Sequence, residues 1–88
     1  MTAKLFIGNL PYSCTDDDLR ALFERSPAEP VSVRVIMDRA TGLSRGYGFV
    51  EMDNYEAAQL ARAALAGSSI GSRNVVIDLA KPNQSARG

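Results

Sequence analysis

The sequence predicts a small α+β domain in which a four-stranded antiparallel sheet carries two helices on one face. Two observations predict this fold class. Four segments alternate their side chains with the period of two that is typical of strands, and two segments repeat apolar residues with helical spacing. Their order along the chain is βαββαβ, with no internal repeat. Such an order favours a sheet that is covered by helices on one side only.

The first strand and the first helix follow from their apolar spacing. Residues 4–9 alternate, with Lys4 and Phe6 on the face opposite the aliphatic side chains. A helix is predicted from Thr15 to about Arg25, because Thr15 and the aspartate three residues later resemble a capping box. Its inner face is expected to contain Leu19, Leu22 and Phe23.

Two strands joined by a long polar hairpin are predicted for the middle of the chain. In residues 31–37, one face is expected to contain Val31, Val33, Val35 and Met37. Residues 38–45 are polar, contain a glycine and form the connection. In residues 45–52, one face contains Arg45, Tyr47, Phe49 and Glu51, and the other contains Gly46, Gly48, Val50 and Met52. Since unpaired charges are rarely buried, the first of these faces is predicted to be solvated, and it carries two aromatic rings.

A second helix and a fourth strand complete the pattern. Asp53 or Asn54 is predicted to cap a helix that ends near Leu65, with Gly67 as its C-cap. The inner stripe of this helix is expected to contain Ala57, Ala58, Ala61 and Leu65. Residues 68–73 are turn material with a short extra pairing around Ile70. In the last strand, residues 74–79, the inward side chains are expected to be Val75, Ile77 and Leu79, and the outward ones Val76 and Asp78.

The order of the elements matches the ferredoxin-like βαββαβ sandwich. The right-handed crossover rule places the first and third strands side by side at the centre of the sheet. Phe6 then joins Tyr47 and Phe49 on the face that has no helices. Three rings on a solvated sheet face form a surface on which nucleic-acid bases can stack, with each base contributing roughly 1–3 kcal/mol.

The amino-acid composition limits the classes of function that the domain can have. The 88 residues have the hydrophobic and charged content of an ordinary globular domain. A single cysteine excludes an internal disulfide, and the absence of histidine removes the usual zinc ligand and acid–base group. We therefore expect no cofactor, no metal and no enzymatic activity. The net charge is zero, so any binding of nucleic acid has to use locally clustered cations together with stacking.

Two stretches resemble the RNA recognition motif. Residues 5–10, Leu-Phe-Ile-Gly-Asn-Leu, resemble its hexapeptide, and residues 45–52 resemble its octapeptide, whose pattern is K/R-G-F/Y-G/A-F-V-x-F/Y. Only Met52 departs from this pattern, at a position expected to lie in the core. The resemblance covers residues 3–82, so we expect a domain over 1–82 and a short polar tail over 83–88. The chain is similar to small stand-alone RNA-binding proteins with one such motif.

The resemblance implies a role for individual residues. Phe6 and either Tyr47 or Phe49 would stack on consecutive bases or on a ribose, and Arg45 would pair with a phosphate. Asn9 would contact a base or brace the loop. The residues expected to hold phosphates or to tune base preference on the same face are Lys4, Arg34, Arg39, Asp78, Ala80 and Lys81.

Each of these residues also has a purely structural interpretation. The three rings could be covered by a C-terminal segment or by a partner, the cations could be solvated, and Asn9 could simply form a turn. Tyr12 is as easily a loop anchor as a ligand contact. Cys14 is expected to have no chemical role.

Three classes of function therefore compete. Single-stranded RNA binding is favoured over a protein-interaction module because the three sheet aromatics are intact, and over an acylphosphatase-like hydrolase because the motif match explains more residues. Single-stranded DNA stays open as a second ligand, and the expected process is RNA processing, stability or translation control. The N-terminus has no apolar run of the length of a signal peptide or membrane span. We expect a cytoplasmic monomer, or a nuclear one in a eukaryote, with no membrane partner and with protein partners unknown.

Overall fold

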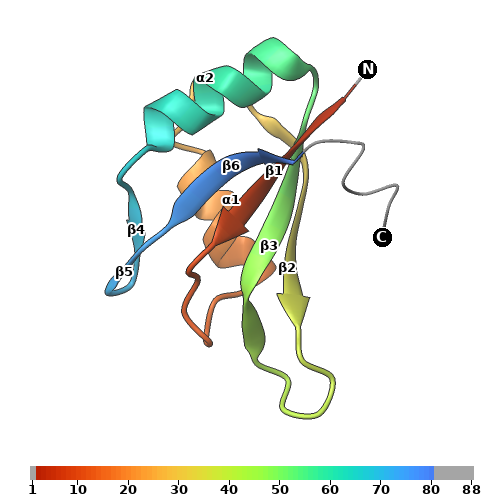
Figure 1. Ribbon diagram of the computed structural model, residues 1–88, viewed down its shortest axis with the longest axis vertical. Coiled ribbons are helices and arrows are strands. Elements are labelled where there is room, and N and C mark those ends of the chain that lie inside the picture. Colours follow the sequence, from red (N-terminus) through yellow and green to blue (C-terminus); the bar gives the residue numbers. More distant parts are fainter. Residues whose placement is uncertain (1, 81–88) are drawn as a thin grey trace.

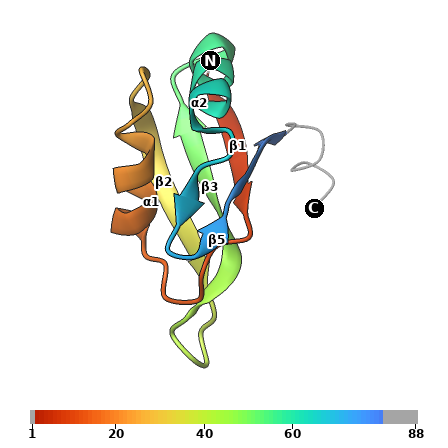
Figure 2. The same cartoon turned by 90° about the vertical axis from the view of Figure 1, so that its left-hand side faces the viewer.

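The computed structural model describes residues 2–80, and it confirms the expected fold class. Strands β1 (Ala3–Gly8), β2 (Pro30–Met37), β3 (Ser44–Met52) and β6 (Val76–Ala80) form one antiparallel sheet in the order β2-β3-β1-β6. Helices α1 (Asp16–Phe23) and α2 (Tyr55–Leu65) pack against one face of it, as Figures 1 and 2 show. The predicted tail at residues 83–88 lies outside the described residues, as does Lys81.

Helix α1 begins at the predicted capping box. The Thr15 hydroxyl accepts a hydrogen bond from the Asp18 amide at 3.2 Å, and the Asp18 carboxylate accepts one from the Thr15 amide at 3.1 Å. The helix ends at Phe23, two residues before the predicted end at Arg25. Beyond Phe23 the amides of Arg25 and Ser26 donate three residues back, which tightens the chain into a turn.

The core lies between the sheet and the helices. Its largest fully buried side chains include Phe23, Leu5 and Ile7, and Met52 is 0% exposed, as expected for the position that departs from the octapeptide pattern. Helix α2 is capped by Asn54, whose side chain accepts from the Ala57 amide at 2.8 Å. The residues that α2 buries are Ala58, Ala61 and Leu65. These alanines let the helix lie close to the sheet.

Two details of α2 differ from the prediction. Ala57 is only half-buried, because it lies at the margin of the inner stripe. Ala66, not Gly67, is the C-cap residue, and Gly67 follows it with a φ of +80°. Glycine is suited to this position because left-handed backbone is strained for other residues. Neither α1 nor α2 is long and apolar enough to cross a membrane.

The ends of β2 depart from the predicted alternation. Val33 and Val35 are buried as expected, but Val31 and Met37 are 50% and 40% exposed. The register between β2 and β3 shifts near both ends of the strand, between Pro30 and Ser32 and again before Met37. A shift in register interrupts the alternation of side chains, so the residues beside it no longer point into the core. On the free edge of β2, the Val35 amide donates to the Asp16 carboxylate of α1 at 2.7 Å.

The last strand begins later than predicted. β6 starts at Val76, while Asn74 belongs to a separate hairpin of β4 (Ser69–Ile70) and β5 (Arg73–Asn74). This hairpin is the short extra pairing expected around Ile70. The predicted alternation holds, because Val75 is buried and Val76 is exposed. Ile77 and Leu79 are only half-buried, as suits an edge strand.

Gly48 provides a test of the central packing. A Cβ atom at this position would lie 2.5 Å from the Arg34 carbonyl oxygen and 3.0 Å from the Val35 Cα atom on β2. Because both atoms belong to the backbone, Gly48→Ala has to displace a strand, and we predict a loss of about 1–3 kcal/mol in the free energy of unfolding. Urea denaturation measures this loss. A midpoint equal to that of the wild type would show that β2 moves aside without penalty.

Cys14 provides a test of burial in the loop after β1. Its thiol is 1% exposed, and burial raises its pKa, as do the nearby carboxylates of Asp18 and Asp16. Since the thiolate is the reactive form, we predict that the folded protein reacts with a maleimide much more slowly near pH 8 than the urea-unfolded chain does. Mass spectrometry of timed samples measures both rates. Equal rates would mean that the loop opens readily.

Candidate nucleic-acid interface

Strand pairing gathers three rings on the sheet face that carries neither α1 nor α2. Phe6 of β1 lies directly opposite Phe49 of β3. The Phe6 and Tyr47 rings are stacked with centroids 5.9 Å apart, and Phe49 meets them edge-on at 5.9 and 6.0 Å. All three side chains are half-buried, so part of each ring stays accessible. We call these three residues the aromatic platform.

Gly8 gives the Phe6 ring its room. A Cβ atom at Gly8 would lie 3.0 Å from Cε2 and 3.3 Å from Cζ of Phe6. The ring therefore leans along β1 over a position that has no side chain. In the next strand Val76, paired with Gly8, is 53% exposed and adds apolar surface beside the ring.

Cations flank the platform. In register, Arg34 of β2 lies opposite Phe49, and Lys4 of β1 lies opposite Glu51. The Lys4 ammonium is 5.7 Å from the centroid of the Phe49 ring, within the range of a cation–π interaction. The Glu51 carboxylate accepts hydrogen bonds from the hydroxyls of Thr2 at 2.7 Å and Ser32 at 3.3 Å. Both expected cations of this region therefore lie on the predicted face.

Arg45 lies at the start of β3, beside the loop between β2 and β3. Its guanidinium is 3.8 Å from the Asp38 carboxylate, and its side chain stays 56% exposed. The same carboxylate accepts hydrogen bonds from the amides of Ala40 at 2.8 Å and Thr41 at 3.2 Å. Asp38 therefore shapes the loop that carries the exposed Arg39 and also holds Arg45 nearby.

On the opposite edge, Asp78 and Ala80 of β6 have different surroundings. Asp78 pairs with Phe6 in register, but its carboxylate lies 3.7 Å from the Arg62 guanidinium of α2. That contact draws the charge toward the sheet edge and neutralises part of it. Ala80 is half-buried opposite Lys4. The roles of both residues in base preference stay predictions.

The Asn9 side chain braces the end of β1 against the β4–β5 hairpin. Its backbone has a φ of 59°, which Asn tolerates better than most residues. Its side-chain amide donates to the Asn74 carbonyl at 2.7 Å and accepts from the Arg73 guanidinium at 3.0 Å. Of the two roles considered for Asn9, the bracing role is the one that these contacts favour.

Tyr12 and Arg73 meet beside the interface, in a contact that sequence reasoning did not predict. Tyr12 is 63% exposed, and the central carbon of the Arg73 guanidinium is 5.7 Å from the centroid of its ring. They meet because the β4–β5 hairpin lies beside the loop that follows β1. No periodic signal in the sequence relates these two loop residues, so the pattern could not have predicted their contact.

Comparison with known proteins identifies the family of this chain. The sequence profile of the RNA recognition motif matches residues 5–76. The chain belongs to the RNA recognition motif family. A crystal structure of the second RNA recognition motif domain of the yeast poly(U)-binding protein superposes with a TM-score of 0.80 and 35% identity, covering 90% of this chain and 94% of that chain.

Two plant relatives have similar sequences. The chain is 44% identical over 87 residues to the mitochondrial glycine-rich RNA-binding protein 3 of Arabidopsis thaliana, covering 99% of this chain and 28% of that protein. It is 33% identical over 88 residues to the chloroplastic small RNA-binding protein 11 of the same plant, covering 100% of this chain and 60% of that protein. The names of both RNA-binding proteins place them in organelles, so they do not support the expectation of a cytoplasmic location.

The bracing role of Asn9 is testable. Asn9→Ala removes two side-chain hydrogen bonds, and alanine tolerates left-handed backbone less well than asparagine does, so we predict a loss of about 1–2 kcal/mol in the free energy of unfolding. Asn9→Gly removes the same bonds without the backbone strain and should lose less. Urea denaturation of both variants measures the order. A brace is excluded if both variants are as stable as the wild type.

Proposed function

We propose that this domain binds short single-stranded RNA by stacking bases on the aromatic platform, and that it does so without catalysis. The single observation that carries the proposal is the cluster of three accessible rings within 6.0 Å of one another on the outer face of the sheet. Each base that stacks on such a ring contributes roughly 1–3 kcal/mol. Membership of the RNA recognition motif family supports RNA as the ligand.

The charges near the platform support the binding of phosphates. Within residues 2–80, two carboxylates beside this surface, those of Asp38 and Asp78, take part in ion pairs with arginines. Lys4 and Arg34 lie on either side of Phe49 and belong to neither pair. Few phosphates can be engaged by so few cations. The expected affinity is therefore in the micromolar range, with a shallow dependence on salt.

The identity of the RNA is a separate question. The yeast structural neighbour is named a poly(U)-binding protein, so oligo(U) is a suitable first probe. The rings themselves offer stacking to any base, so single-stranded DNA belongs in the same titration. We place the domain in RNA processing, stability or translation control.

The platform is tested by a double variant. Tyr47→Ala/Phe49→Ala removes two stacking surfaces, and we predict that its affinity for fluorescein-labelled hexauridine falls by about tenfold or more. Tyr55→Ala is the matched control, because Tyr55 is 59% exposed on α2, which packs on the other face of the sheet. It should bind like the wild type. Equal binding by the double variant and the control would exclude the platform.

Salt provides an independent test of the phosphate contacts. With two phosphates engaged, the affinity for a single strand should fall about sevenfold between 50 and 200 mM salt, since the slope is about −0.7 per phosphate. Arg34→Gln should weaken binding and make this slope shallower. Fluorescence anisotropy titrations at three salt concentrations measure both quantities. A slope as steep as that of an extended basic surface would contradict the proposed mode of binding.

A further inference from the structure

We propose that the base stacked on the Phe49 ring is a guanine, and that the Glu51 carboxylate and the Lys4 ammonium recognise it. This inference rests on the proposed function, because it names the base that one ring of the aromatic platform selects. Glu51 occupies the position of the octapeptide that the family pattern leaves variable. The selection therefore comes from this chain and not from the shared motif.

The two charged residues form a row beside the rings on the outer face of the sheet. Phe49 and Glu51 are two positions apart on β3, and Lys4 and Phe6 are two positions apart on β1, so all four side chains point to the same side. The strand register sets Lys4 directly opposite Glu51, as it sets Phe6 opposite Phe49. The charged row lies about 7 Å from the row of rings, since a strand rises about 3.4 Å per residue.

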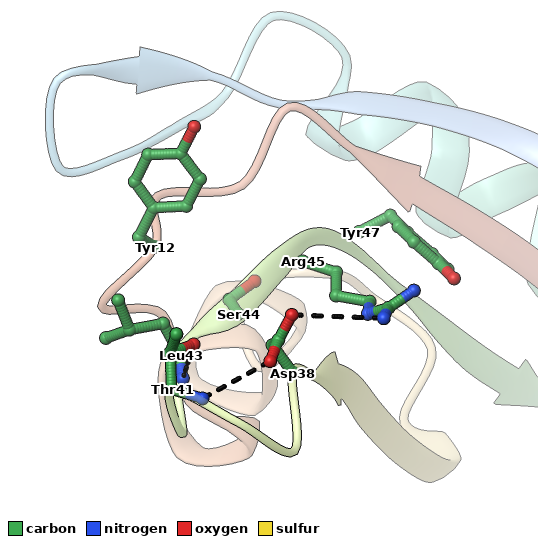
Figure 3. A pocket seen from close by; sticks show the side chains of 7 residues that line it. All are labelled: Tyr12, Asp38, Thr41, Leu43, Ser44, Arg45 and Tyr47. Carbon is green, nitrogen blue, oxygen red and sulfur yellow. Dashed lines mark hydrogen bonds and ion pairs between the residues drawn. The ribbon is translucent and has the colours of Figure 1, made fainter.

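Lys4 and Glu51 carry opposite charges but are not joined in a salt bridge. At the other end of the outer face of β3, Arg45 lies 3.8 Å from the Asp38 carboxylate, as Figure 3 shows. Among residues 2–80, no such bridge joins Lys4 to Glu51. The Lys4 ammonium lies instead 5.7 Å from the centroid of the Phe49 ring. Its three N–H donors are therefore beside the place where a base would stack, and they suffice for a base and a phosphate together.

The Glu51 carboxylate is held by two hydroxyls and keeps free lone pairs. Its Oε2 atom accepts from the Thr2 hydroxyl at 2.7 Å, and its Oε1 atom accepts from the Ser32 hydroxyl at 3.3 Å. A carboxylate has about four lone-pair positions on its two oxygens, so each oxygen keeps one for a ligand. The side chain is half-buried, and hydrogen bonds are stronger there than in water. Glu51 thus offers a ligand two oriented acceptors and no donor.

Guanine is the base whose edge fits this pair of groups. Its N1–H and its N2 amino group are adjacent donors, so together they can bind both oxygens of one carboxylate. Its O6 atom is next to N1 on the same edge and accepts from an ammonium. Uracil has a single N–H between two carbonyl oxygens, and adenine and cytosine have an amino group next to a ring nitrogen that carries no proton. None of these three bases can bind a carboxylate through two hydrogen bonds.

The experiment compares alternating hexamers, because one of their two registers puts the second base on Phe49. Unlabelled UGUGUG, UAUAUA and UCUCUC compete with labelled hexauridine in fluorescence anisotropy. We expect the wild type to bind UGUGUG about tenfold more tightly than UAUAUA or UCUCUC. Replacing each guanosine by inosine removes only the N2 amino group, so most of this advantage should be lost.

Glu51→Gln tests the carboxylate itself. The glutamine keeps one acceptor oxygen and loses the second, so we expect the preference for UGUGUG to fall to about twofold or less, while the affinity for hexauridine does not fall. Glu56→Gln is the matched control, because Glu56 is exposed on α2, and it should keep the full preference. Lys4→Gln should lower the preference as well, since a neutral amide donates more weakly than an ammonium.

Four outcomes would overturn the inference while leaving the platform intact. The wild type could bind UGUGUG and UAUAUA equally, or inosine could replace guanosine without loss. Glu51→Gln could keep the preference, or it could tighten every hexamer by the same factor, which would mean that the carboxylate only repels phosphates. A wild type that binds none of the oligomers would overturn the proposed function together with this base preference.

Discussion

The structure depends on one pairing, that of Phe6 on β1 with Phe49 on β3. Because side chains alternate along a strand, this register decides both faces of the sheet at once. It directs Leu5 and Val50 into the core and both rings to the outside. A slip by one residue would exchange the two faces, burying the rings and exposing the aliphatic side chains. The stability of the domain and its candidate interface are therefore set by the same hydrogen bonds.

A chain with no net charge can still present a surface suited to an anion. The carboxylates nearest the platform each have a partner: Asp38 lies near Arg45, Asp78 near Arg62, and Glu51 accepts from two hydroxyls. Those ion pairs are exposed and individually weak, so they tune the local potential more than they stabilise the fold. Base stacking on the rings provides binding energy that these charges cannot supply. Single-stranded nucleic acid suits such a surface, because each of its bases has a π-face.

Most of the fold prediction rested on local sequence patterns. Strand alternation, the Thr15 capping box and the Asn54 cap need only neighbouring residues, and the fold class followed from them. The exposure of Val31 and Met37 depended on register shifts that only the partner strand sets. The brace between Asn9 and Arg73 joins residues 64 positions apart, and Tyr12 lies in a loop without a period. What the sequence could not reveal is therefore mainly the packing of loops against distant segments.

The contact between Asp16 and Val35 has a consequence for how copies of this domain behave at high concentration. β2 is an edge strand, and an edge presents amides that a strand of another molecule can pair with. At Val35 the outward amide is already bonded to a carboxylate at 2.7 Å. An incoming strand would have to displace a charged side chain that also begins helix α1. Helix α1, which covers the core, thus also occupies one of the amides through which another molecule could pair with the β2 edge.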